Sequence, residues 1–286
     1  MTALKKAIAP MIGALLAIGA ATSAGAQEIV KSSEVAESGK LAIANTLDYA
    51  PFEYLDANGE QTGIIIELAK AMADEMDVEL SIQRTPFPSM IPGLAAGRFS
   101  VAWETFSATP ERLEQVDFVT FLKAGVAASA LPGRVDDFAG DLPLCGKTVG
   151  VSAGSLADFL VEKLNAECAD AGKEPVEKSV FNSSTDIVQA VISARIDARL
   201  DDATASTFFE IESKGKLVVL PTLYEVSPLG MAIKKGDTET AEMMRTGLAA
   251  LFANGQYKAV LDKYGMSAYA IKEPYFVGSM DDLRDE

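Results

Sequence analysis

The amino-acid sequence predicts an α/β fold made of two similar units with a cleft between them. Apolar segments of strand length alternate with amphipathic segments of helix length, which is typical of mainly parallel sheets flanked by helices. The alternation occurs in two passes, over 41–122 and 148–220, and a further strand and helices return after residue 229. A chain of 286 residues, 49% of them hydrophobic, is long enough for two medium domains with proper cores.

Hydrophobic periodicity defines the elements of the first pass. Ile65, Leu68, Met72 and Met76 fall on one face of a helix, which predicts a helix over 64–76. The strands of this pass are expected at 41–44, 78–83 and 99–103, and an apolar and aromatic segment follows at 116–122. A long strand is expected after this pass, at 125–131. Shorter helices are expected at 89–96 and from residue 110, and the polar segment 28–38 is expected to be loose.

Two helices of the second pass begin with a Ser-x-x-Asp pattern that is typical of a helix N-terminus. The pattern occurs at Ser155 with Asp158 and at Ser183 with Asp186. Further helices are expected at 203–211, 237–252 and 257–264. The strands are expected at 148–151, 179–181, 196–200, 216–220 and 229–233.

Polar residues follow several of these strands, where ligands of open α/β sheets bind. The loops that we expect to form a site are 46–52, 104–112, 152–155 and the pair Asp201 and Asp202. They come from both passes, so a cleft between two units would bring them together. The sequence therefore predicts a small-molecule site in that cleft.

Composition excludes several classes of function. The formal net charge of −16 argues against nucleic acid and anionic membranes as partners. The chain has no histidine, which removes Ser-His-Asp and Cys-His catalysis and the commonest metal ligand. With two cysteines, a cysteine-rich metal site is also excluded, and we expect neither a metal nor a cofactor.

The N-terminus has the pattern of a secretory signal peptide over 1–26. Lys5 and Lys6 precede an apolar stretch over 7–21, and Ala24-Gly25-Ala26 fits a cleavage site after Ala26. We therefore expect an exported protein. In an oxidising compartment Cys145 and Cys168 are expected to form a disulfide, the alternative being two separate buried thiols.

Short segments along the whole predicted mature chain carry a family resemblance. In order, they are 49–53, 63–69, 107–112, 116–118, 146–151 with 154–155, 195–198 with 202, 230–233 and 254–257. With these segments the chain resembles the periplasmic solute-binding proteins of ABC importers, specifically the polar amino-acid-binding family 3 with the type II periplasmic-binding-protein fold. The resemblance implies a monomeric receptor that is not an enzyme, closes on an amino acid like a Venus flytrap, and delivers it from the periplasm to a membrane permease. It also implies one lobe over 28–123 and 229–286 and another over 124–228, with a hinge at the two crossings.

The resemblance also assigns roles to individual residues. Arg112 corresponds to the arginine that binds the ligand α-carboxylate, the alternative being a surface arginine at a helix start. Asp202 corresponds to the acid that pairs with the α-ammonium, and it also suits a helix N-cap. The other ligand contacts that the resemblance implies are Thr105, Ser107, the helix start at Ser155, and the aromatic residues Tyr49 and Phe87.

The chain departs from its relatives at Trp103 and Glu104, where the family has small residues. Trp103 is expected either in the pocket or in the core. Glu104 could pair with the ligand ammonium, select a cationic side chain, or point into the core with a partner. Residue Thr46 stands where relatives that bind basic amino acids have an aspartate. The ligand is therefore open between polar amino acids, cationic ones, and opine- or ectoine-like derivatives. The alternative from another class is a dehydratase of small carboxylates, with Glu104 as general base.

Overall fold

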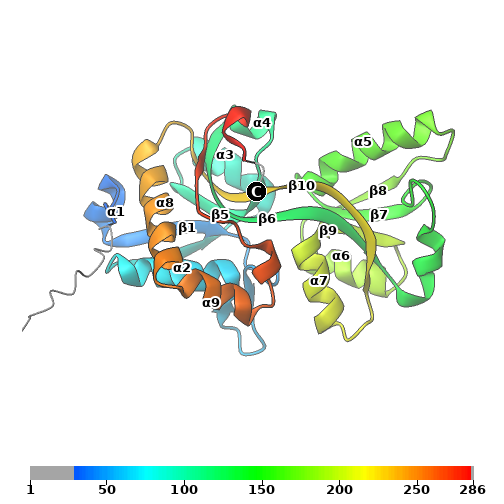
Figure 1. Ribbon diagram of the computed structural model, residues 1–286, viewed down its shortest axis with the longest axis horizontal. Helices are drawn as coiled ribbons and strands as arrows, with labels where there is room; N and C mark the ends of the chain where they lie inside the picture. Colours follow the sequence, from blue (N-terminus) through cyan, green and yellow to red (C-terminus); the bar gives the residue numbers. More distant parts are fainter. Residues whose placement is uncertain (1–28, 285–286) are drawn as a thin grey trace, which may run out of the picture.

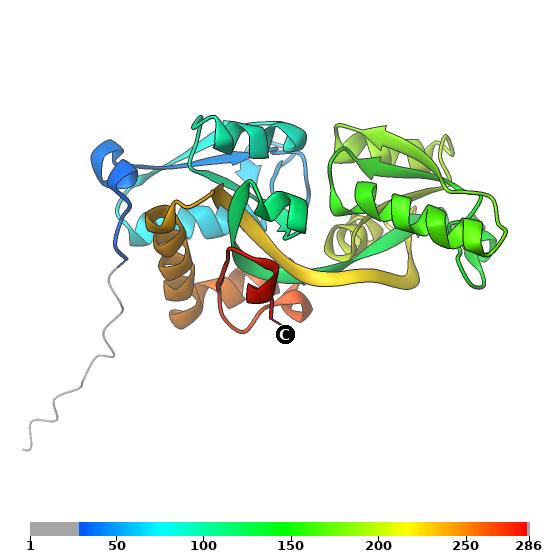
Figure 2. The same cartoon turned by 90° about the horizontal axis from the view of Figure 1, so that it is seen from above.

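The computed structural model describes residues 29–284, so the predicted signal peptide lies outside the described part of the chain. Two lobes lie side by side and are joined by two long strands (Figures 1 and 2). We call residues 29–123 and 229–284 lobe 1, and residues 124–228 lobe 2. None of the helices within 29–284 has the length and apolar character needed to cross a bilayer.

Lobe 1 places helices around the parallel strands β4, β1 and β5. Its strands are β1 (Lys40–Asn45), β2 (Tyr54–Leu55), β3 (Gln61–Thr62), β4 (Glu79–Arg84), β5 (Val101–Ser107) and β11 (Phe276–Val277). Its helices are α1 (Ser33–Ser38), α2 (Ile64–Glu75), α3 (Met90–Ala95), α4 (Pro110–Leu113), α8 (Thr238–Ala253) and α9 (Gln256–Lys263), with short 3₁₀ turns at 87–89, 267–269 and 280–282. The α1 helix corrects the expectation of a loose segment at 28–38, because Ser32 caps it and Val35 is buried.

Lobe 2 repeats the arrangement with the parallel strands β8, β7 and β9. Its strands are β7 (Thr148–Ser152), β8 (Glu177–Phe181) and β9 (Ala198–Asp202). Its helices are α5 (Leu156–Asp170), α6 (Ser184–Ile192) and α7 (Ala203–Glu212), with a 3₁₀ segment over 132–138. The side chains of Ser155 and Ser183 accept the N–H groups of Asp158 and Asp186, so the two predicted helix starts are confirmed.

The crossings between the lobes are continuous strands. β6 (Val116–Ala130) and β10 (Val218–Lys234) pair antiparallel along their length, with register shifts in the middle. The sequence predicts separate segments instead, at 116–122 and 125–131 and again at 216–220 and 229–233, and this division is wrong. Together the strands form one path in the order β4-β1-β5-β10-β6-β9-β7-β8, with β11 beside β6. The crossing is visible in Figure 1, where β6 and β10 link the two halves.

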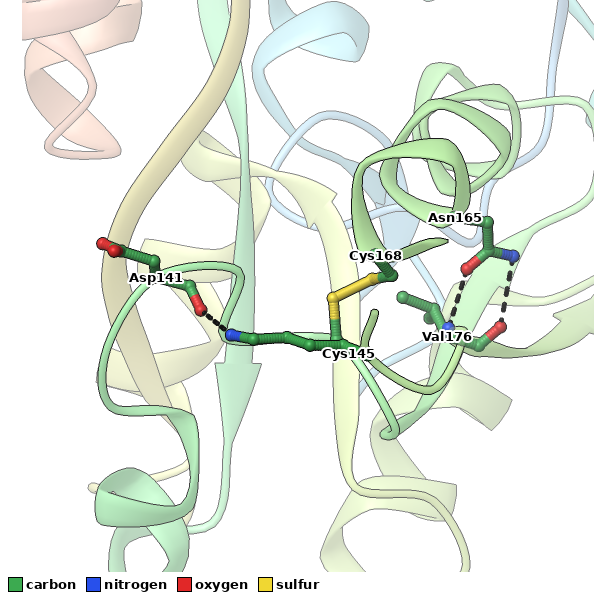
Figure 3. The surroundings of a disulfide bond; sticks show 6 residues. Asp141, Cys145, Asn165, Cys168 and Val176 are labelled. Atoms are coloured by element: carbon green, nitrogen blue, oxygen red, sulfur yellow. Dashed lines mark hydrogen bonds between the residues drawn. A yellow bond between two sulfur atoms is a disulfide. The ribbon is translucent and has the colours of Figure 1, made fainter. Parts of the chain in front are cut away.

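Each lobe has its own core. The buried hydrophobic residues of lobe 1 form two clusters that include Ala124 and Ala205 from across the boundary, and lobe 2 forms two further clusters. The predicted disulfide between Cys145 and Cys168 is confirmed, with Cα atoms 5.8 Å apart (Figure 3). It joins the segment before β7 to the last turns of α5 and therefore lies entirely within lobe 2.

Candidate functional site

A cavity of about 470 Å³ lies between the lobes. Both lobes contribute to its wall, because the carboxyl ends of three parallel strands in each lobe reach it. The lining residues are Thr46, Asp48, Tyr49, Arg84, Pro86, Phe87, Pro88, Glu104, Thr105, Ser152, Ala153, Ser155, Leu156, Ala157, Asn182, Ser183, Ser184, Asp201 and Asp202. All four loops that the sequence singles out therefore contribute to one cavity.

The sequence misses two further parts of the wall. Arg84 at the end of β4 lines the cavity and donates from Nε to the carbonyl of Thr46 at 3.2 Å. The residues 182–184, which follow β8, line it from lobe 2. Both segments follow strands that the sequence does predict, so the rule that selected the other four loops would also have selected these.

Six of the nine predicted ligand contacts line the cavity, namely Tyr49, Phe87, Glu104, Thr105, Ser155 and Asp202. Ser107 is buried behind it, where its hydroxyl accepts a hydrogen bond from Ser227. Trp103 is fully buried in the core of lobe 1, where its ring meets Phe121 edge-on. Of the two alternatives for Trp103, the structure supports the core position, and we do not keep it as a ligand contact.

Arg112 lies beside the cavity and joins the two lobes. Its Nη1 donates to the carbonyl of Ser107 at 2.8 Å, and its Nη2 donates to the carbonyl of Gly154 in lobe 2 at 2.6 Å. The guanidinium also lies 5.8 Å from the ring centre of Phe87 and 5.9 Å from that of Phe159. Burial lowers the pKa of Arg112 to about 10, so it stays charged at neutral pH. Arg112 is therefore a buried cation and not a surface arginine.

Asp202 and its neighbour Asp201 form an acid pair at the lobe 2 wall. Thr105 donates to Asp202 at 2.9 Å, and the hydroxyl of Tyr49 lies 3.0 Å from Asp202 and 2.7 Å from Asp201. Arg199 is completely buried behind them and pairs with Asp201. Asp201 is therefore part of the site, although the sequence suggests only a neighbour of Asp202.

The protonation of Asp202 is strongly affected by its burial. Burial, followed by repulsion from Asp201, raises the pKa of Asp202 to about 7. Burial also raises the pKa of Tyr49 well above its ordinary value, so its hydroxyl keeps its proton. Asp202 occupies the N-cap position of α7, as the sequence suggests, but its side chain accepts no helix N–H and faces the cavity instead.

A second acid pair lies at the lobe 1 wall. Glu104 is 1% exposed and accepts the backbone N–H of Thr46 at 2.8 Å. Glu53 is fully buried, and its Oε1 accepts the hydroxyl of Thr46 at 3.2 Å. Burial raises the pKa of both carboxyl groups, and the neighbouring Glu104 raises that of Glu53 further.

Five pairs of residues thus connect the lobes across the cavity. Besides the bonds of Tyr49, Thr105 and Arg112, the hydroxyl of Thr185 donates to Asp48 at 2.8 Å. These bonds join the two lobes directly, and we call this arrangement closed. Within residues 29–284, no group of three or more acids or cysteines has the arrangement of a metal site.

Comparison with known proteins shows that the chain is similar to extracellular binding proteins for amino acids. Residues 41–267 match the bacterial extracellular solute-binding proteins, family 3. The L-arginine-binding protein of Pseudomonas aeruginosa is 30% identical over 225 residues, which cover 76% of this chain and 84% of that protein. The histidine-binding periplasmic protein of Salmonella typhimurium is 28% identical over 233 residues, covering 79% and 87% of the two chains.

Solved structures of amino-acid-binding proteins are also similar to this chain. An ancestral arginine-binding protein bound to arginine is 29% identical, with a TM-score of 0.70, and the match covers 79% of this chain and 98% of that one. An ancestral amino-acid-binding protein described as a precursor of cyclohexadienyl dehydratase is 27% identical, with a TM-score of 0.73, over 81% of this chain and 97% of that one.

Proposed function

The chain belongs to the family 3 bacterial extracellular solute-binding proteins, and we propose that it captures an amino acid between its lobes and delivers it to the permease of an ABC importer. The observation that carries the proposal is the 470 Å³ cavity, which both lobes line with strand-end polar groups. This volume is in the usual range for small-molecule sites. The named relatives in the comparison bind arginine or histidine.

The polar groups beside the cavity suit the two charges of an amino acid. Asp202 accepts hydrogen bonds only from the hydroxyl groups of Tyr49 and Thr105. The ammonium group of a ligand would therefore be the first cation to bond to it directly. Arg112 can bind a carboxylate with two parallel hydrogen bonds once the ligand replaces the carbonyl of Gly154. The amino acid would then take over a contact that now joins the lobes directly.

Ligand binding would act by stabilising the closed arrangement. The interlobe bonds of Tyr49, Thr105 and Arg112 are made only when the lobes meet. A ligand held by Asp202 on one lobe and Arg112 on the other would add its own contacts to the closed form alone. Because the ligand would bind the closed form more tightly than the open form, the fraction of closed molecules would rise. The lobes would move about a hinge at β6 and β10. The permease would recognise this form.

The chain would work in the periplasm as a monomer and release its ligand unchanged. The disulfide between Cys145 and Cys168 suits an oxidising compartment. The dehydratase alternative has less support, because the named relatives are binding proteins. Incubating the protein with its ligand and analysing the products separates a receptor from an enzyme.

Titration calorimetry of the mature protein with the common amino acids tests the proposal. We expect at least one amino acid to bind, and we expect Arg112→Ala to weaken its binding by 100-fold or more, roughly the value of a lost charge-assisted pair. A thermal melt shows whether the variant remains folded. An unchanged affinity in Arg112→Ala contradicts the role of Arg112, and a protein that binds no amino acid contradicts the function.

A further inference from the structure

The acid pair of lobe 1, Glu53 and Glu104, has no role in the proposed binding of the ligand α-ammonium and α-carboxylate groups. Glu104 lines the cavity, while Glu53 lies next to it in the protein interior. Among residues 29–284, no lysine or arginine forms an ion pair with either of them. A buried acid without a cationic partner is costly unless a proton or a ligand compensates its charge.

The hydrogen bonds of the pair show where its proton lies. The Oε2 atom of Glu53 has no N–H or hydroxyl donor within reach. Burial and the neighbouring Glu104 raise the pKa of Glu53 well above its ordinary value, and a protonated Glu53 could donate toward Glu104, whereas a carboxylate has no donor. Glu104 already accepts the N–H of Thr46, which favours its ionised form. The proton therefore belongs to Glu53, and Glu104 faces the cavity as a carboxylate.

The other cavity acids have different partners. Asp201 is neutralised by Arg199, and Asp48 accepts the hydroxyl of Thr185 on the outer side of the cleft. Asp202 bonds with Tyr49 and Thr105 and is the acid assigned to the ligand ammonium. Glu104 differs from these acids, because the groups that donate hydrogen bonds to it are neutral and belong to its own lobe.

We propose that Glu104 binds a second positive charge, at the side-chain end of the ligand, and that Glu53 positions it as a neutral hydrogen-bond donor. The inference rests on the proposed function, since it assumes an amino acid held by Arg112 and Asp202. A neutral amino acid brings one cation and one anion, and both are used by that grip. A basic amino acid brings a further guanidinium or ammonium group, which compensates Glu104. The ligand class is therefore amino acids with a cationic side chain.

Calorimetry with L-arginine and L-citrulline tests this selectivity, because citrulline has nearly the same shape without the charge. We expect the wild-type protein to prefer arginine by roughly 10- to 100-fold, the usual value of a charge-assisted hydrogen bond. We expect Glu104→Gln to reduce this preference to within about threefold. Glu79→Gln, the same chemical change at the exposed start of β4, serves as the control and leaves both affinities unchanged.

Two substitutions at Glu53 test its positioning role. Glu53→Gln keeps an N–H donor toward Glu104, whereas Glu53→Leu removes it. We expect the glutamine variant to retain more of the arginine preference than the leucine variant, with thermal melts used to check that both fold. Equal losses in the two variants would overturn the positioning role.

The outcomes separate the two proposals. If the wild-type protein binds neutral amino acids as tightly as arginine, or if Glu104→Gln keeps the full preference, the selectivity assignment is wrong and the receptor function stands. If Glu104→Gln weakens arginine and citrulline equally, Glu104 has a structural role only. If no amino acid binds, both proposals fail.

Discussion

The two lobes each bury a pair of acids at the cavity wall, but they compensate the charge in different ways. In lobe 2 the buried guanidinium of Arg199 neutralises Asp201, and hydroxyl groups from lobe 1 bond to Asp202. In lobe 1 no lysine or arginine among residues 29–284 forms an ion pair with Glu53 or Glu104, and Glu53 keeps its proton instead. The lobe 2 pair is therefore engaged in closure, whereas the lobe 1 pair keeps one carboxylate available to a ligand. Buried acids thus stabilise the contact between the lobes at one wall of the cavity, and in our proposal they select the ligand at the other wall.

Replacing Arg199 should have the largest effect on stability, because it removes the cation on which the lobe 2 pair depends. Arg199→Leu leaves Asp201 buried without a cation, and we expect a loss of about 3–5 kcal/mol in the free energy of unfolding. In lobe 1, Glu53→Gln keeps a donor and should cost less than about 1 kcal/mol. Urea unfolding of both variants provides the measurement.

A double variant sharpens this test. Arg199→Leu combined with Asp201→Leu removes both charges, and we expect it to recover much of the lost stability, since an apolar pair can replace a buried ion pair. If Arg199→Leu is no more destabilising than Glu53→Gln, the two lobes do not differ in the way described above.

The pH dependence of stability provides a second test of the lobe 2 pair. The pKa of Asp202 is raised to about 7 in the folded protein, from an ordinary value of 3.8. Between these values the folded state binds more protons than the unfolded state, so the contribution of Asp202 to stability falls as the pH rises from about 4 to 7. Asp202→Asn cannot titrate. We expect its free energy of unfolding to rise relative to the wild-type value across this window, by up to about 4 kcal/mol.

This experiment uses the ligand-free protein, with unfolding followed at several pH values. A constant difference between Asp202→Asn and the wild-type protein would show that Asp202 is ionised throughout. The effect should be smaller if bound amino acid is present, because its ammonium favours the ionised form of the acid.

The elements and the location of the site could be predicted from the sequence, because both depend on local patterns. Strand-end polar loops and Ser-x-x-Asp helix starts are short-range signals. The continuous crossing strands could not be predicted, because glycine and proline, here Gly125 and Pro228, usually weaken or end a strand. In the structure Gly125 allows close approach, since a Cβ there would lie 2.7 Å from Leu223. Pro228 lies beside Lys123 between two register shifts, where strands tolerate proline.

The partners of the site residues were harder to predict. β5 is buried along its whole length, so no alternation of polar and apolar residues shows that Trp103 enters the core while Glu104 reaches the cavity. The bond from Arg112 to Gly154 and the pairing of Arg199 with Asp201 also have no local signature. The first joins a side chain to a distant backbone carbonyl, and the second depends on a charge hidden inside a strand.

The smallest predicted effect concerns the outer contact between the lobes. Thr185→Ala removes the hydroxyl that donates to Asp48, an exposed hydrogen bond that forms only in the closed arrangement. Exposed hydrogen bonds contribute about 0.5–1 kcal/mol, so we expect amino-acid affinity to fall by no more than about fivefold. The loss should lie mainly in faster dissociation, which stopped-flow fluorescence can measure. An equal loss in Thr185→Ala and Tyr49→Phe would contradict the view that the buried acid pair of lobe 2, rather than the rim of the cleft, controls closure.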